Sequence, residues 1–129
     1  MYRGFTLLEL VVVVIILGIL ATLGFTQYTK MVEKGRTSEA KMVLGQIRSA
    51  QQAYRLEYGA YTTVMGNLSV QPPTACGASG NHYFSYNVSA TTGTARRCTA
   101  NGKAPVAASQ YRVTLTYGTG TFGGTAGYY

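Results

Sequence analysis

The sequence contains no Asp, and its four acidic residues are all glutamates, at positions 9, 33, 39 and 57. The chain beyond Glu57 therefore carries no acidic side chain. Paired carboxylates are the usual groups for general acid and base catalysis, and oxygen-rich Ca²⁺ loops depend on Asp and Glu ligands. We therefore expect neither kind of site in the second half of the chain.

Histidine is almost as scarce. The single histidine, His82, has no acidic residue nearby in the sequence to orient it as a catalytic base. The sequence also lacks a His and Cys cluster with zinc-ligand spacing, and it lacks a phosphate-binding loop of the GxxxxGK type. We predict a protein that is not an enzyme and that uses no metal and no cofactor.

One long apolar run near the beginning dominates what the chain does contain. From Phe5 to Phe25, Glu9 is the only ionisable side chain. About 20 apolar residues at 1.5 Å each form a helix roughly 30 Å long, which is enough to cross the hydrocarbon of a bilayer. Backbone groups in lipid must be hydrogen-bonded internally, so we expect this segment to be helical despite its many valines.

Glu9 is unusual inside such a segment. A carboxylate costs about 3 kcal/mol at the centre of a bilayer and less near the interface, so an intramembrane acid generally has a function and a partner. No basic side chain lies within the segment. One hypothesis pairs Glu9 with an amino group of another chain, freed by a cut between Gly4 and Phe5. The alternative is a signal anchor in which Glu9 lies among the lipid headgroups without a specific role.

The helix is predicted to continue beyond the apolar run and to become amphipathic. Its apolar positions recur at spacings of three and four, which places them on one helix face: Ala40, Val43, Leu44, Ile47, Ala50 or Gln51, and Tyr54. No proline occurs before Pro72, and Gly59 suits the left-handed turn that ends a helix. We predict one helix from near Phe5 to about Tyr58, its second half covered by the rest of the chain.

The remainder of the chain is predicted to form a small antiparallel sheet. Turn and loop signals dominate residues 60–81. Strands are predicted at 83–88 and 111–117, with a weaker one that includes 97–99. The glycine-rich tail, 118–129, is either a last edge strand or a flexible segment. The predicted fold class is α+β, a long N-terminal helix packed on a sheet of about three or four strands.

The residues Gly4-Phe5-Thr6-Leu7-Leu8-Glu9, followed by the apolar run, closely resemble the signal and N-terminal helix of bacterial type IV pilins and of the related type II secretion pseudopilins. The resemblance implies a type IV pilin-like fold. It further implies that a prepilin peptidase cuts between Gly4 and Phe5 and methylates the new N-terminal Phe5. Glu9 would then pair with the terminal amine of a neighbouring subunit.

The resemblance also implies an organisation and a function. It divides the chain into a leader at 1–4, an apolar half-helix at 5–28 and a globular head at 29–129. The implied function is a structural subunit of a type IV pilus, held first in the bacterial inner membrane and then assembled by inner-membrane machinery into a homo-oligomeric extracellular filament. Adhesion and motility are roles open to any such filament.

Two alternatives stay open within this architecture. The first is the major pseudopilin of a type II secretion system, although the heads of that family typically hold Ca²⁺ through acidic residues that this chain lacks. The second is a DNA-uptake or minor pilin that binds nucleic acid through basic residues of the acid-free half: Arg96, Arg97, Lys103 and Arg112. A solvated basic surface is the simpler explanation of these four residues.

Cys76 and Cys98 are the only cysteines. In a chain delivered outside the cytoplasmic membrane we expect them to form a disulfide, and closing a loop of about 20 residues stabilises a small head by about 3 kcal/mol. A redox role is the alternative, but the pair lacks the CxxC spacing that such a role favours.

Overall fold

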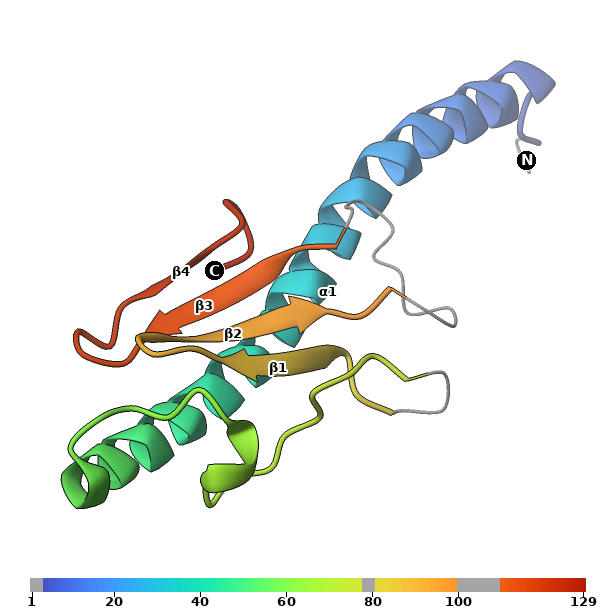
Figure 1. Ribbon diagram of the computed structural model, residues 1–129. Helices are drawn as coiled ribbons and strands as arrows, with labels where there is room; N and C mark the ends of the chain where they lie inside the picture. The colour runs from blue at the N-terminus through green and yellow to red at the C-terminus, as the bar shows by residue number, and fades with distance from the viewer. Residues whose placement is uncertain (1–3, 78–80, 100–109) are drawn as a thin grey trace.

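The computed structural model describes residues 4–77, 81–99 and 110–129. It consists of one long helix, α1 (Leu7–Tyr58), and a four-stranded antiparallel sheet that lies against the second half of this helix (Figure 1). The strands are β1 (Phe84–Val88), β2 (Thr92–Arg97), β3 (Arg112–Thr116) and β4 (Phe122–Gly124), and a short 3-10 helix, η1 (Met65–Asn67), precedes them. The predicted α+β class is confirmed.

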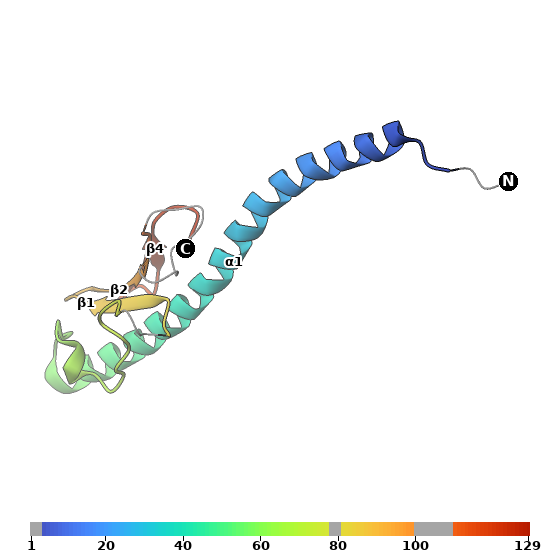
Figure 2. The ribbon, with the colours of Figure 1, turned by 90° about the vertical axis from the view of Figure 1, so that its right-hand side faces the viewer.

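Helix α1 begins and ends at capping residues. The Thr6 hydroxyl accepts a hydrogen bond from the backbone N–H of Glu9, and the Glu9 carboxylate accepts one from the backbone N–H of Thr6. At the other end Gly59 adopts a left-handed conformation, with φ 81°, and its N–H donates to the carbonyl of Arg55. The predicted helix end at Tyr58 is confirmed. The helix is curved but unbroken over its 52 residues (Figure 2).

The strands follow one another across the sheet in the order β1-β2-β3-β4. The strands predicted at 83–88 and 111–117 are confirmed to within one residue at each end. The weaker strand predicted to include 97–99 exists but lies earlier, because β2 runs from Thr92 to Arg97 and leaves out residues 98 and 99. Gly93 lies inside this strand, and a glycine there weakens the strand pattern in the sequence. Gly93 allows close packing there, since a Cβ at this position would lie 3.2 Å from Leu44 Cδ2 and the leucine side chain would have to shift by a few tenths of an ångström.

The tail contains the last edge strand, which was one of the two alternatives for residues 118–129. β4 pairs with β3, and beyond it the ring of Tyr128 stacks on that of Tyr111 with 4.1 Å between centroids. Gly124 has φ 131°, and a Cβ at this position would collide with the carbonyl oxygen of Arg112. Glycine at 124 is therefore required for the close pairing of β4 with β3.

The core lies between α1 and one face of the sheet. The predicted apolar stripe of the helix faces it, and Leu44 and Ile47 are both 0% exposed. The core residues that the rest of the chain contributes are largely aromatic and β-branched: Leu68, Phe84, Tyr86, Val88, Ala95, Tyr111, Val113, Leu115 and Tyr117. The sheet thus covers the second half of α1, as predicted.

Gln51 is a polar member of this buried face. The sequence left Ala50 and Gln51 as alternatives for one core position, and the structure buries both. The Gln51 side-chain amide donates to the Thr62 carbonyl at 2.8 Å and accepts from the Thr62 N–H at 3.0 Å. These two bonds satisfy the buried amide and fix the loop after α1 against the helix.

Replacing Leu44 by alanine is expected to lower the free energy of unfolding by about 3 kcal/mol, because it leaves a cavity between α1 and β2. Met42 offers a matched control, since it lies half a turn away and is 68% exposed. Met42→Ala is expected to change the free energy by less than about 0.5 kcal/mol. Urea unfolding of the chain in detergent, followed by tyrosine fluorescence, measures both values. Equal losses in the two variants would contradict the assigned core.

Candidate functional site

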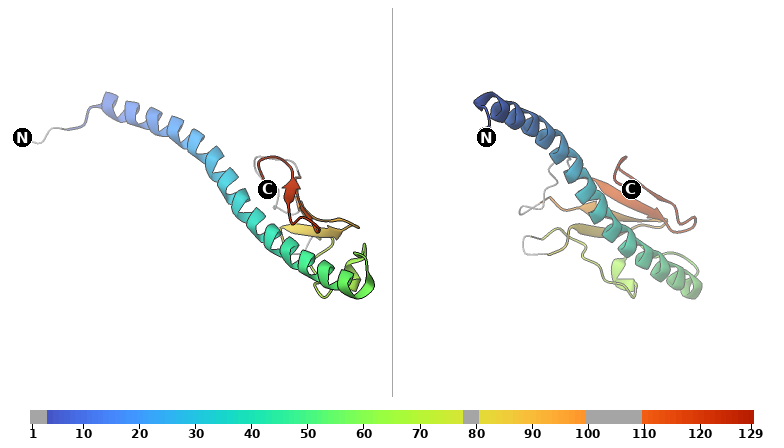
Figure 3. Two further views of the ribbon diagram at one scale, coloured as in Figure 1. Left: turned by 90° about the vertical axis from the view of Figure 1, so that its left-hand side faces the viewer. Right: turned by 180° about the vertical axis from the view of Figure 1, so that it is seen from behind.

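The first half of α1 has no covering partner in the described chain. Between Phe5 and Phe25 every large apolar side chain is 44% to 85% exposed, and burial begins at Thr29. Figure 3 shows this half projecting away from the sheet. By length and composition α1 is able to cross a membrane. So large a continuous apolar surface is unfavourable in water and marks a site of contact with lipid or with other proteins.

Thr6 and Glu9 form a capping box at the start of α1. Besides the two backbone bonds of the cap, the Thr6 hydroxyl lies 2.9 Å from Glu9 Oε2. Both bonds that the carboxylate accepts fall on Oε2, and no described residue donates to Oε1. Gly4 and Phe5 precede the helix in exposed chain, and Phe5 is 85% exposed. The Thr-x-x-Glu pattern was the sequence signal for this cap, although our sequence analysis did not use it.

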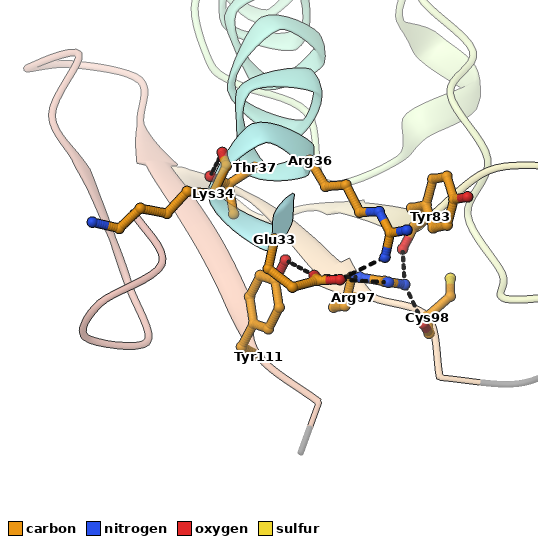
Figure 4. Close-up of polar contacts among 8 residues, drawn as sticks. All are labelled: Glu33, Lys34, Arg36, Thr37, Tyr83, Arg97, Cys98 and Tyr111. Atoms are coloured by element: carbon orange, nitrogen blue, oxygen red, sulfur yellow. Dashed lines mark hydrogen bonds and ion pairs between the residues drawn. The ribbon is translucent and has the colours of Figure 1, made fainter. Parts of the chain in front are cut away.

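A second polar cluster lies where the exposed half of α1 gives way to the covered half (Figure 4). Glu33 of α1 is 4% exposed, and its carboxylate accepts hydrogen bonds from three side chains. Arg97 donates through Nε at 3.1 Å and through Nη2 at 3.2 Å, and the Tyr111 hydroxyl donates at 2.7 Å. Arg36, one turn along α1, donates at 2.6 Å. The cluster therefore ties the helix to β2 and to the start of β3.

Arg97 completes the cluster from the side of the sheet. It is 0% exposed, and its Nη1 donates to the carbonyl oxygens of Tyr83 and Cys98. The guanidinium also lies 4.9 Å from the ring centroid of Tyr83. All five donors of a buried guanidinium need acceptors, and the Glu33 carboxylate and the two carbonyls supply most of them.

This burial corrects one sequence prediction. Arg97 was a candidate contact to nucleic acid, and that prediction is wrong, because its charge is enclosed and neutralised by Glu33. Arg96 and Arg112 are exposed and lie opposite each other on β2 and β3. Lys103 lies outside the described residues. The sheet therefore presents two neighbouring arginines on its outer face.

The pKa of Glu33 reflects this environment. Burial raises the pKa of the carboxyl group, but the hydrogen bonds from Arg97 and Tyr111, the charge of Arg97 and the bond from Arg36 outweigh burial and lower it below its ordinary value. For Tyr111, burial and the bond that it donates to Glu33 raise the pKa of the hydroxyl. Glu33 is therefore a stable carboxylate, and Tyr111 is a stable hydrogen-bond donor.

The predicted disulfide between Cys76 and Cys98 is confirmed, and it is adjacent to this cluster. Cys98 follows Arg97 directly, and its N–H donates to the Tyr83 carbonyl at 2.8 Å. The disulfide thus fastens the segment around Cys76 to the end of β2, beside the buried arginine. His82 lies 2.9 Å, through Nε2, from the Ala75 carbonyl oxygen. In the described part of the chain no three metal-ligating side chains gather.

The comparison with known families agrees with the architecture. A family model described as type IV pilin-like G and H matches residues 37–123, and a model of the prokaryotic N-terminal methylation motif matches residues 1–25. The chain belongs to the type IV pilin-like family. The first match covers more than half of this pilin-like chain, including α1 from residue 37 onward and most of the sheet. The second contains Gly4, Phe5 and Glu9.

Individual relatives point to two kinds of protein. The pilin-like chain is 36% identical over 91 residues to the type IV major pilin protein PilA of Myxococcus xanthus, and 42% identical over 48 residues to the type IV major fimbrial protein FimA of Dichelobacter nodosus. It is also 38% identical over 73 residues to the type II secretion system core protein G of Pseudomonas aeruginosa.

These alignments cover only part of each relative. They include 70%, 37% and 55% of this chain for PilA, FimA and core protein G, and they span 39%, 31% and 51% of those relatives. Family membership therefore rests on the residues that match. These residues include most of α1, the helix on which the site is built.

Replacing Glu33 by glutamine is expected to lower the free energy of unfolding at neutral pH by about 3 kcal/mol, because the buried Arg97 loses its counter-charge. Glu39→Gln is the matched control: the same change six residues further along α1, at an exposed side chain. It is expected to cost less than about 0.5 kcal/mol.

Measuring both variants across pH tests the electrostatic cause. Since the folded pKa of Glu33 is below its unfolded value of about 4.3, the stabilisation by its charge is complete above that value. It is lost as the pH falls through the folded pKa. Urea unfolding curves of wild type and Glu33→Gln are thus expected to converge on acidification, and a difference that is the same at every pH would contradict the assignment.

Proposed function

We propose that this pilin-like chain is a structural subunit of a type IV pilus, an extracellular helical filament assembled through the apolar half of α1. The observation that carries the proposal is the uncovered apolar surface from Phe5 to Phe25 on a helix whose other half is covered. Packed against the same segments of other copies, this surface leaves water and gains close van der Waals contact. The pilin relatives and the methylation motif support this use of the helix.

The same segment serves before assembly as a membrane anchor. In the proposed sequence of events, residues 5–28 hold the precursor in the bacterial inner membrane, and the head at 29–129 lies outside it. A prepilin peptidase removes residues 1–4 and methylates Phe5. The exposed and extended chain at Gly4 and Phe5 gives such an enzyme access to the bond between them.

Glu9 has a specific part in the proposed assembly. Its Oε2 is occupied by Thr6, whereas no described residue donates to Oε1. A carboxylate enclosed in an apolar filament core needs a counter-charge, and the Phe5 amine of a neighbouring subunit would supply one. The pair would fix the axial register of one helix against the next.

A second candidate function is a major pseudopilin of a type II secretion system. The similarity to the type II secretion system core protein G favours it. The two functions share the helix and differ in where the filament is found and in what fails without it. Loss of surface filaments indicates the pilus, whereas loss of protein secretion with normal surface filaments indicates the pseudopilin.

Intact mass and N-terminal sequence of the chain recovered from sheared extracellular material test the main proposal. The expected chain begins at a methylated Phe5 and is recovered as filaments. A chain that still begins at Met1, found in the membrane fraction alone, would overturn the proposal and leave a membrane-anchored head. A processed chain that is confined to the cell envelope favours the pseudopilin.

Replacing Glu9 by glutamine tests the proposed pairing. The substitution keeps the shape and a capping acceptor but removes the charge, so membrane insertion and processing are expected to persist while the amount of sheared filament falls at least about tenfold. Thr22→Ala is a control within the same exposed half, since the Thr22 hydroxyl bonds only to the Gly18 carbonyl. Normal filament yield from Glu9→Gln would contradict the pairing.

A further inference from the structure

The charges on the covered half of α1 are sorted by side. At about 100° per residue, five of its six basic residues fall within an arc of roughly 60°: Lys30, Lys34, Lys41, Arg48 and Arg55. We call this arc the basic flank. The sixth, Arg36, is bound to Glu33. The exposed acids Glu39 and Glu57 lie on the opposite side of the helix, which we call the acidic flank.

The basic flank runs beside β3 and β4. Arg48 donates through Nε to the carbonyl oxygen of Tyr117 at 2.9 Å, and Lys41 Nζ lies 5.6 Å from the ring centroid of Phe122. Lys30 borders a hollow between α1 and the C-terminal tail. These contacts hold the positive charges along one edge of the head, and no acidic residue of α1 lies among them.

The acidic flank lies towards β1 and η1. Burial and, second, the charge of Glu39 raise the pKa of Tyr86 in β1, and Glu57 borders a hollow that Asn67 of η1 also lines. Both ion pairs within the described residues use Glu33. Glu39 and Glu57 therefore have no basic partner in the described part of their own chain.

The two flanks have matching spacings. Lys30 and Arg48 are 18 residues apart, and so are Glu39 and Glu57. Eighteen residues are five helical turns, or about 27 Å, so each pair lies in line along the axis. Each acid follows its base by nine residues, which is two and a half turns. When two copies of α1 lie side by side with a shift of nine residues, both exposed acids of one copy are level with basic residues of the other.

We propose that the flanks form a contact between copies of this chain, in which Lys30 and Arg48 of one copy pair with Glu39 and Glu57 of a second. Nine residues correspond to a shift of about 13.5 Å along the helix axis between the copies. Phe5 and Glu9 are level at a shift of four residues, or about 6 Å, so the proposed Glu9 pairing joins a different pair of copies. The inference rests on the proposed filament function and adds to it a contact between the heads. Because the two flanks are different surfaces, the contact is heterologous and can repeat along an open helix.

Charge complementarity favours a second copy over an anionic polymer as the occupant. A polymer such as nucleic acid would use the basic flank alone and gain nothing from the acids. At the proposed shift, by contrast, no basic residue of one α1 is level with a basic residue of the next. The pairing thus uses both acids that have no basic partner among the described residues of their own chain.

Charge reversal in the full chain, produced in cells that assemble pili, tests the contact. Lys30→Glu and Glu39→Lys alone are each expected to reduce the sheared filament about three- to tenfold, since two like charges then meet in every repeat. The double variant, Lys30→Glu with Glu39→Lys, is expected to restore the yield. Both side chains are exposed, and thermal unfolding of each variant verifies that the head still folds.

Lys34→Glu is the matched control. It makes the same charge change one turn along the same flank, but at the proposed shift Lys34 is level with Val43 rather than with an acid. A smaller loss than in Lys30→Glu is expected. Wild-type filaments that weaken at higher salt would also support the contact, because exposed charge pairs are screened.

The possible failures are distinct. Absence of filaments from the wild type overturns the proposed function and the contact together. Normal wild-type filaments with no loss in Lys30→Glu, or no recovery in the double variant, overturn the contact alone. A duplex DNA probe that binds the purified chain, and loses affinity equally with Lys30→Glu and Lys34→Glu but not with Glu39→Lys, assigns the basic flank to nucleic acid instead.

Discussion

One helix must satisfy two environments, and this constraint shapes the rest of the molecule. Up to Phe25 every large apolar side chain of α1 is exposed, and from Ala40 to Gln51 its inner face is sealed by the sheet. Since α1 has no break, the two halves cannot turn independently to find separate partners. The sheet therefore covers only the second half of the helix. The apolar surface of the first half remains available for contact with lipid or with other proteins.

The Glu33 cluster lies at the boundary between these halves. Its bonds join α1 to β2 and to Tyr111 beside β3, and the disulfide of Cys98 is next to them. A buried charge is expensive unless it is fully paired, and here three side chains donate four hydrogen bonds to one carboxylate. The cluster therefore fixes the beginning of the covered half of α1 to the head.

The four glutamates of the chain lie in three different environments. Glu9 caps its own helix, Glu33 is buried against Arg97, and Glu39 and Glu57 remain exposed without a basic partner in the described chain. Because the second half of the sequence supplies no carboxylate, the positive charges of the sheet must be neutralised from α1 or from outside the chain. Any acidic surface that pairs with the basic residues of the sheet must therefore come from α1 or from another molecule.

The sequence by itself determined the elements whose cause is local. Apolar periodicity and Gly59 predicted α1, alternating residues predicted β1 and β3, and the motif from Gly4 to Glu9 indicated the family. Only the tertiary structure placed β2 at Thr92–Arg97, with Gly93 packed against Leu44. Only the tertiary structure joined Arg97 to Glu33 across 64 positions. Charge pairing between distant residues depends on which surfaces the fold brings together, and no spacing along the chain records it.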